Sequence, residues 1–411
     1  MNSLKNIFNE IASNDKKIIY LIYFLPIALL AGSLIINLTI FTIIFYFLYE
    51  VIKEKKLNYF YNIYTLFLFA IFIYLILNSI FIAKNTDSII RALGFSRFII
   101  LTVAIAYYLN LRNKLYEKKM LFFWSIILFI VTFDLIFEFI FGFNTLNFRS
   151  TYEGRLSSFT GDELKIGGYY FGFFLLSLFF FYEKTKLFNF LVILFLVTAF
   201  LIGERSNFFK ILFMISVSYF FFYKLHFFKK ILILIIPILI IILITVLNYN
   251  FKERFYNNII NPIVKNNLDG SVNSIEESRH FSHYMSAIEI FNDNKIFGIG
   301  IKNFRNESYQ RQINHKSIYQ GSTHPHQIHL EFLSELGIFG YLLIMSLLIY
   351  SIIKGYKIFK LKNDVYSAAA SLFILATILP ILPSGSFFTT YGATIFWINF
   401  SFIIRDKIKL N

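Results

Sequence analysis

The sequence has no cysteine among its 411 residues, and only 15% of its residues are charged. The absence of cysteine excludes a disulfide framework and thiolate chemistry. A soluble domain carries roughly 25% charged residues, so this chain has too few charges to cover a surface that faces water. The sequence also has no internal repeats and no linker rich in proline or glycine. These deficits argue against a string of soluble domains, which a chain of this length would otherwise allow.

Apolar residues make up 57% of the chain, and they gather in runs that approach the ~20 residues needed to cross a lipid bilayer. The runs predict helices near residues 18–31, 34–51, 59–82, 95–110, 120–142, 167–182, 187–202, 207–222, 231–247, 336–353, 366–382 and 387–404. Gly32-Ser33 and Asn37 interrupt the first two runs, which we interpret as a helical hairpin. We therefore predict a single all-α polytopic membrane domain, residues 1–411, with about twelve transmembrane helices.

The distribution of lysine and arginine predicts the orientation of these helices. With both termini in the cytoplasm, the cytoplasmic segments hold 22 of the 39 Lys and Arg residues, the short outer segments hold 8, and the long outer segment 248–325 holds 9. Cytoplasmic loops collect Lys and Arg, and long loops are exempt from this rule. The net charge of +15 then reflects topology and contact with anionic membrane lipids. We expect no binding of nucleic acid.

Two outer segments are long enough to build a site, a shorter loop at 143–166 and a long loop at 248–335 between the ninth and tenth helices. In the long loop, Ser274 and Glu277 form a capping-box pattern. Apolar residues then recur at helical spacing, which predicts an amphipathic helix at about 275–291 near the membrane surface. Arg279 and His283 share its polar face, which is also what an ordinary solvated face would present.

Four of the seven histidines lie within residues 315–329. Pro325 suits the first turn of a helix, so we expect His326 at the outer mouth of the tenth helix. His324, His326 and His329 with Glu331 offer ligands of the type that zinc prefers, but their spacing is not a strong zinc pattern. We predict no metal and no cofactor. An exposed histidine loop without chemistry remains an alternative.

Charged residues inside or beside the apolar runs are a second group of candidates, because such charges are costly in a membrane. Asp134 and Glu138 occupy one face of the fifth helix, where Arg97 of the fourth could pair with them in a purely structural role. Arg205 lies at the outer turn between the seventh and eighth helices, and Arg155 lies in the shorter outer loop. Each arginine has an alternative role as an anchor of a helix end.

Several of these residues form an ordered pattern. His326-Gln327, nine residues and then Gly337-x-x-Gly340 resemble the His-[Asn/Ser/Gln]-x9-Gly-x-x-Gly signature of the O-antigen ligase and polymerase superfamily, in which asparagine is commoner than Gln327. Three further features are similar to that family, namely Ser278-Arg279 before Gly298-Ile299-Gly300 and Phe304, the turn Gly203-Glu204-Arg205-Ser206, and Asp134-x-x-x-Glu138 followed by Gly142. The topology resembles the family over the whole chain, and the specific residues cover about a tenth of it.

The resemblance implies a metal-independent, inverting glycosyltransferase of the GT-C type in the bacterial inner membrane, with a periplasmic active site. The donor would be a glycan on undecaprenyl diphosphate, and the acceptor a sugar hydroxyl on lipid A–core, on another lipid-linked glycan or on a protein. Diphosphate suits the guanidinium fork of arginine, which points to Arg205, Arg279 and Arg155. A histidine with a pKa near ~6.5 suits a general base, which points to His326. Supporting roles fall to Gln327, Gly337, Gly340, Asp134 and Glu138.

Two alternatives to an O-antigen ligase-like enzyme remain open. One is an O-antigen or exopolysaccharide polymerase of the same superfamily, which the sequence does not separate from a ligase. The other is a transporter or flippase for lipid-linked sugar, in which Asp134 and Glu138 would mark a translocation path. The transporter is disfavoured because no inverted repeat of broken helices is visible.

Overall fold

The computed structural model describes residues 13–55, 57–111, 113–161, 163–223, 225–260 and 279–405. Every regular element within these ranges is helical. The main elements are α2 (Ser13–Ala31), α3 (Ser33–Glu54), α4 (Ile63–Asn78), α5 (Thr86–Leu111), α6 (Asn113–Phe141), α7 (Ile166–Phe179), α8 (Thr185–Leu201), α9 (Arg205–Phe221), α10 (Phe227–Leu247), α14 (Arg279–Asp293), α15 (Phe304–Ile313), α16 (Ile328–Lys362), α17 (Val365–Thr377) and α18 (Thr390–Ile404).

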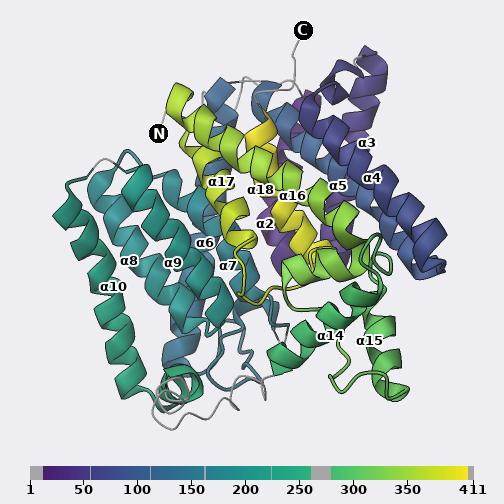
Figure 1. Cartoon of the computed structure of the whole chain (residues 1–411). Helices are drawn as coiled ribbons and strands as arrows, with labels where there is room; N and C mark the ends of the chain where they lie inside the picture. The colour runs from purple at the N-terminus through teal and green to yellow at the C-terminus, as the bar shows by residue number, and fades with distance from the viewer. Residues whose placement is uncertain are drawn as a thin grey trace.

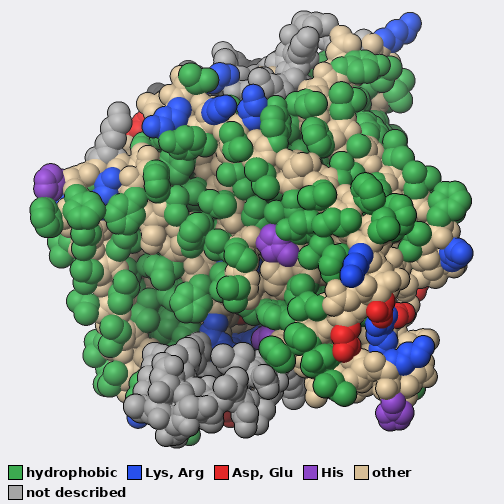
Figure 2. Space-filling model, in the orientation of Figure 1, with side chains coloured by type: hydrophobic (Ala, Val, Ile, Leu, Met, Phe, Trp, Pro, Cys, Tyr) green, Lys and Arg blue, Asp and Glu red, His purple; other side chains and the backbone are tan. Residues whose placement is uncertain are grey.

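Each of the twelve predicted apolar runs overlaps a helix of the structure. Among the described residues, six helices are long and apolar enough to cross a membrane, and five shorter ones are also apolar. The six long ones are Ser33–Lys53, Ile63–Ala83, Thr86–Asn110, Tyr116–Phe141, Phe227–Leu247 and Ile328–Lys362. Figure 2 shows a broad apolar band across the visible face, with lysine and arginine side chains near the top and again toward the lower right. The prediction of an all-α, multi-pass membrane protein is therefore confirmed.

The helices form one bundle around a shared core (Figure 1). At its centre α17 packs against α16, α18, α7 and α9, and α18 also packs against α5. The indole of Trp397 and the rings of Phe396 and Phe400 on α18 are fully or almost fully buried there. α10 lies at one side of the bundle against α8, and α14 and α15 lie together at one end of it (Figure 1). We call this end the site end.

The connection between α17 and α18 corrects two predicted boundaries. The predicted helix 366–382 ends at Thr377, and the predicted helix 387–404 begins at Thr390. Residues 378–389 instead form an irregular loop, which contains Pro380 and Pro383. Proline lacks the N–H that a helix needs and disfavours helical geometry at the residue before it. We call residues 378–389 the proline loop.

The long segment between α10 and α16 is more helical than expected. The predicted helix at 275–291 corresponds to α14, which ends at Asp293; Ser274 and Glu277 lie outside the described residues. The helix α15 was not predicted. The tenth predicted helix, 336–353, begins eight residues earlier, at Ile328. Pro325 therefore precedes α16 and does not belong to its first turn, which corrects the reason given for placing His326 there.

Gly337 breaks α16 near the site end. Its φ of 66° is outside the helical region, and the helix resumes after it. The break frees backbone groups on both sides, and the segment between α14 and α15 binds them: Ile299 and Gly300 donate to the carbonyls of Ser334 and Glu335 at 3.1 and 2.7 Å. On the other side, Ile338 donates to Lys295 O at 2.8 Å. The backbone groups freed by the break in α16 are thus satisfied by the loop that follows α14. These hydrogen bonds hold the first part of α16 against that loop.

Candidate functional site

Four histidines from two elements meet at the site end. His326 lies just before α16 with a left-handed φ of 57°, a conformation that costs energy outside glycine and is often found at functional sites. The centre of its ring lies 3.8 Å from that of His324, 5.0 Å from His283 and 5.4 Å from His280. The first pair comes from the segment before α16 and the second from α14. We call these four residues the histidine cluster.

The surroundings of His326, His324 and His280 lower their pKa values and so favour the neutral imidazole. Burial lowers the pKa of His326 to about 3, and the neighbouring His324, His283 and His280 lower it further in the same direction. Burial and the charge of Lys302 lower the pKa of His324 to about 4. Burial, followed by the charges of Arg205 and Arg155, also lowers the pKa of His280. A neutral ring can accept a proton, so His326 has the protonation state that a general base needs.

Three arginines converge beside the cluster. Arg254 donates from Nε to Gly203 O at 3.0 Å and from a terminal nitrogen to Glu153 O at 3.3 Å, so it ties two turns together. Arg205 donates to Arg254 O at 3.5 Å. Burial, Arg155 and Arg205 lower the pKa of Arg254 to about 10. We call Arg155, Arg205 and Arg254 the arginine cluster.

Among the described residues, the arginine cluster carries more positive charge than the neighbouring acids balance. Glu204 is the acidic side chain whose field opposes it. Its two carboxylate oxygens accept hydrogen bonds from Gly167 N at 3.2 Å and Asn207 Nδ2 at 2.7 Å. Gly203 makes this packing possible, because its φ is 76° and a Cβ there would lie 2.1 Å from Gly154 O. Like charges held together without matching acids are favourable only where an anion binds.

The structure brings some of the predicted site residues together and gives others a supporting position. Arg155, Arg205 and His326 are brought to the same end of the bundle. Arg279 begins α14, the helix that carries His280 and His283, but its side chain lies outside the described residues. The side-chain oxygen of Gln327 accepts a hydrogen bond from Leu330 N at 2.8 Å and so caps the N-terminus of α16, next to His326.

Gly337 and Gly340 act through close packing. A Cβ on Gly337 would lie 2.3 Å from Ile296 O, and one on Gly340 would lie 2.6 Å from the ring of Tyr74 on α4. Both positions therefore exclude any side chain unless the neighbours move. The two glycines let α14 with its following loop, and α4, approach α16 directly below the histidine cluster.

Asp134 and Glu138 hold the shorter outer loop. Asp134 accepts from Thr145 N at 2.8 Å and from Ser158 Oγ at 2.6 Å, and Glu138 accepts from the backbone N–H of Ser158 at 2.7 Å. Both carboxylates are almost completely buried. The suggested pairing with Arg97 is wrong, since Arg97 donates instead to Thr390 Oγ1 at 2.9 Å. The two acids thus position the loop that carries Arg155.

The residues considered as metal ligands have other partners. His329 Nε2 contacts Ile378 O at 2.8 Å, and its Nδ1 contacts Tyr341 OH at 3.2 Å. Glu331 is buried and accepts from Ser386 Oγ and from Phe387 N. His329 and Glu331 therefore attach α16 to the proline loop and the end of α17. Among the described residues, no group of three or more His, Cys, Asp or Glu side chains is arranged to hold a metal ion.

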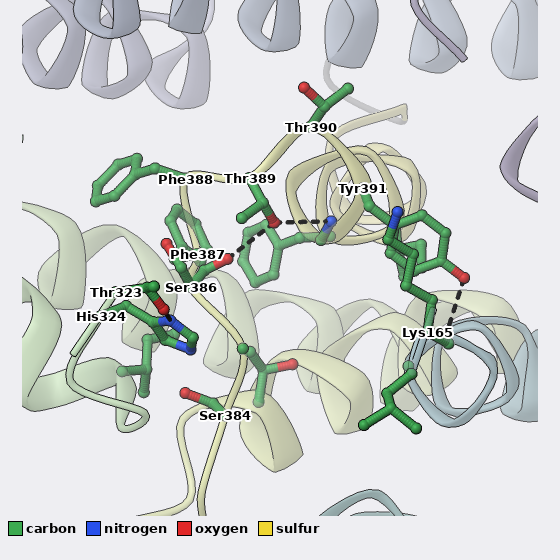
Figure 3. Close-up of a pocket in the computed structure, with 18 of the residues that line it drawn as sticks. Lys165, Thr323, His324, Ser384, Ser386, Phe387, Phe388, Thr389, Thr390 and Tyr391 are labelled. Atoms are coloured by element: carbon green, nitrogen blue, oxygen red, sulfur yellow. Dashed lines mark hydrogen bonds between the residues drawn. The ribbon is translucent and has the colours of Figure 1, made fainter. Parts of the chain in front are cut away.

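A cavity of about 840 Å³ opens beside the histidine cluster. His324 and Thr323 line one side of it, and Lys165 and Tyr391 lie on the opposite side (Figure 3). Between them runs the last part of the proline loop into α18, with Ser384, Ser386, Phe387, Thr389 and Thr390 along the wall (Figure 3). Aromatic rings with a few polar groups are typical of a ligand site, and the volume is in the usual range for one.

Sequence reasoning missed four parts of this site. They are Arg254, His280, Lys210 and the proline loop. The proline loop had a signal, because Pro380 and Pro383 with the following Ser-Gly-Ser are typical of a turn. Lys210 also had a signal, as a charge inside the predicted apolar run 207–222. Arg254 and His280 had none beyond residue type, because spacing along the chain does not reveal which outer segments meet in space.

Comparison with known proteins gives one family. Residues 190–345 match the family model described as O-Antigen ligase. The matched segment runs from α8 into α16 and includes Arg205, Arg254, His326 and both signature glycines. Comparison with curated proteins finds no match. The resemblance noted from the sequence is therefore confirmed by this match, and the matched residues 190–345 lie within a multi-pass membrane protein.

Proposed function

We propose that this protein transfers a glycan from undecaprenyl diphosphate to an acceptor sugar hydroxyl at the periplasmic face of the bacterial inner membrane, as an O-antigen ligase-like enzyme. The observation that carries the proposal is the meeting of the unbalanced arginine cluster with the neutral histidine cluster at one end of a membrane bundle. The family match supports the same class of reaction. The acceptor would be lipid A–core, another lipid-linked glycan or a protein.

The arginines would hold the leaving group. When the acceptor oxygen attacks the anomeric carbon from the face opposite the diphosphate, the bond from that carbon to the diphosphate oxygen breaks. Negative charge then develops on the departing oxygen, and Arg155 and Arg205, with Arg279 from α14, are the guanidinium groups that would stabilise it. Arg254 would hold the two turns that present them. Charge supplied in this way leaves no step that requires a metal or a cofactor.

His326 would take the proton from the attacking hydroxyl. Burial and the neighbouring histidines lower its pKa to about 3, which makes the ring neutral but a weak base. A bound diphosphate adds negative charge beside the ring, and negative charge raises the pKa of a histidine. Donor binding would therefore strengthen the base only when a substrate is in place. The product is a glycoside of inverted configuration, undecaprenyl diphosphate and a proton on His326.

A test compares His326→Ala with His226→Ala in cells that lack the native protein. His226 is exposed near the start of α10 and far from the histidine cluster in sequence, so its removal controls for loss of an imidazole. We expect His326→Ala to insert into the membrane normally and to lose transfer by a factor of about 10²–10⁴. His226→Ala should transfer glycan like the wild type. Full transfer by His326→Ala would remove the role assigned to it.

The same experiment separates the two enzymes of the superfamily. Loss of every attached chain in a deletion strain identifies a ligase, whereas attachment of single repeats identifies a polymerase. A transporter has less support, because the acids that would mark its path, Asp134 and Glu138, have their oxygens occupied by the 143–166 loop. Movement of lipid-linked sugar in proteoliposomes without formation of a glycosidic bond would favour the transporter instead.

A further inference from the structure

The cavity beside His324 has a strong excess of positive side chains. Five cationic residues line it, and two acidic residues do so. The cations are Arg91, Lys165, Lys210, Lys302 and Arg305, and the acids are Asp87 and Glu204. A cavity of one sign concentrates ligands of the opposite sign. None of these five cations belongs to the arginine cluster, although Lys210 lies on α9, the helix that begins with Arg205.

Two of the five cations already have an anionic partner. Lys165 pairs with Glu163, and Lys302 lies 3.9 Å from Glu331 while it donates to Ser386 Oγ. Arg91 and Arg305 are exposed, so water can solvate them. These four residues therefore make the cavity positive without leaving any charge that demands a ligand.

Lys210 differs from the others. Its side chain is only 4% exposed, and its one hydrogen bond among the described residues is a long contact of 3.5 Å to Pro383 O. A lysine ammonium can donate three hydrogen bonds, and a buried charge is costly without a partner. The hydroxyl of the next residue, Ser384, is buried and has no hydrogen-bond partner in the described part of the chain. The Lys210 ammonium, which has this long hydrogen bond, a contact with the Phe171 ring and the field of Glu204, and the Ser384 hydroxyl thus border the same cavity.

The proline loop connects this pair to the histidine cluster. Ser384 N donates to His326 O at 2.7 Å, so a ligand bound by Lys210 and Ser384 lies next to the segment that carries His326. Phe387 and Tyr391 supply aromatic faces in the same cavity, a combination suited to sugar rings. Neutral sugars would use the rings and hydroxyls but would add no anionic partner to the long hydrogen bond that Lys210 makes with Pro383 O.

We infer that the cavity binds a sugar unit that carries a negative charge, as a carboxylate or a phosphate, and that Lys210 and Ser384 are its specificity-determining residues. The inference rests on the proposed function, because it assigns the charge of a glycan that the proposed reaction joins. The anionic group accepts from the Lys210 ammonium and from the Ser384 hydroxyl, and the sugar ring lies toward Phe387 and Tyr391. No covalent step is involved.

The test measures binding of three matched probes to the purified full-length protein in detergent, namely glucuronate, glucose 6-phosphate and glucose. We expect at least one charged probe to bind about tenfold more tightly than glucose, the gain expected from one charge-assisted contact. Comparison of glucuronate with glucose 6-phosphate identifies the anionic group. Lys210→Met should remove most of the preference, and Ser384→Ala should reduce it in a variant that leaves the buried ammonium intact. The exposed Lys316, outside the cavity, supplies the control Lys316→Met, which should bind all three probes like the wild type.

Equal binding of glucose and both charged probes, or an unchanged preference in both Lys210→Met and Ser384→Ala, overturns the inference. The variant His326→Ala keeps this result separate from the proposed function. His326 does not line the cavity, so its replacement should abolish transfer while the preference for a charged probe persists. If His326→Ala loses transfer and the protein shows no preference for a charged probe over glucose, the inference fails while the proposed function stands. Retained transfer in His326→Ala removes the assigned base and leaves the binding result standing.

Discussion

Arginines at the two ends of the bundle are held in opposite ways. At the end away from the site, Arg405 lies 2.8 Å from Glu117 and also pairs with Asp364, so one buried guanidinium meets two carboxylates. At the site end, Arg155, Arg205 and Arg254 lie within reach of one another's charge, and Glu204 is the acid that opposes them. The first arrangement joins the start of α6, the start of α17 and the end of α18. The second leaves positive charge unbalanced.

The contrast separates structural charge from functional charge. A buried ion pair that is complete contributes to the fold, and removing one partner is strongly destabilising. A cluster of like charges costs stability, so it persists where a ligand of opposite sign compensates for it. The two ends therefore predict different outcomes for the same kind of substitution, and the expected effects below run from the largest to the smallest.

Arg405→Met should mainly lower stability. The change leaves Glu117 and Asp364 buried beside each other without a cation, which costs about 3–5 kcal/mol. Thermal unfolding in detergent measures this as a lower midpoint, while transfer per folded molecule stays near the wild-type rate. Lys357→Met, an exposed change near the same end of α16, is the control and should leave the midpoint unchanged. An Arg405→Met protein as stable as the wild type would contradict the claim that Arg405 stabilises the fold.

Arg205→Gln should mainly lower activity. Loss of one donor to developing charge costs a factor of about 10²–10³ in the rate of transfer, and the melting midpoint should fall little or rise, because repulsion within the arginine cluster is relieved. Arg205→Lys keeps the charge but loses the planar fork, so its rate should fall between those of the wild type and Arg205→Gln. If Arg205→Gln lost as much stability as Arg405→Met and transferred glycan normally, Arg205 would have a structural role and no role in transfer.

Gly337→Ala should affect both properties through the break in α16. A Cβ there would lie 2.3 Å from Ile296 O at a φ of 66°, and a strained residue of this kind costs on the order of 1–3 kcal/mol. We expect a lower melting midpoint and weaker transfer, because the segment after α14 no longer docks below the histidine cluster. Gly94→Ala is the matched control, since a Cβ at Gly94 meets nothing within 4 Å. Equal behaviour of the two variants would contradict the role of the break.

The value of kcat/KM should change little as the pH falls from 7 to 5. A base must be unprotonated, and the pKa of His326 in the free protein is lowered to about 3. The neutral form therefore persists as the pH falls from 7 to 5, and kcat/KM should change by less than about twofold. An ordinary histidine with a pKa near ~6.5 would lose roughly thirtyfold over the same range. A loss of that size, in protein that remains folded at pH 5, would show that the cluster does not hold His326 in its neutral form.

Some of these features could be predicted from the sequence, and the reason is local chemistry. Long apolar runs require helices in lipid because the backbone must bond to itself, so each of the twelve runs overlaps a helix. His326 and Arg205 could be named because their short motifs recur in a known family. The break at Gly337 was visible only as a glycine that allows close packing, and its use as a docking site for the segment after α14 depends on hydrogen-bond partners 35 or more residues upstream.

Other features depend on where separate segments meet. His280 and Arg254 are single residues in outer segments, and their place in the site follows from how α14 and the segment Lys252–Ile260 after α10 pack against the bundle. Lys210 lies within an apolar helix, where it looks like an interfacial anchor until Pro383 and Ser384 are seen beside it. The proline loop was concealed by its apolar residues, which extended the predicted helices 366–382 and 387–404 into it.

Binding of undecaprenyl diphosphate to the purified protein, measured by native mass spectrometry, tests the central contrast most directly. The wild type should prefer undecaprenyl diphosphate to undecaprenol, and Arg205→Gln should bind the diphosphate at least about tenfold more weakly, whereas folded Arg405→Met and His326→Ala should bind it like the wild type. Equal affinity of Arg205→Gln and wild type for the diphosphate would contradict the claim that the unbalanced arginines serve an anionic lipid.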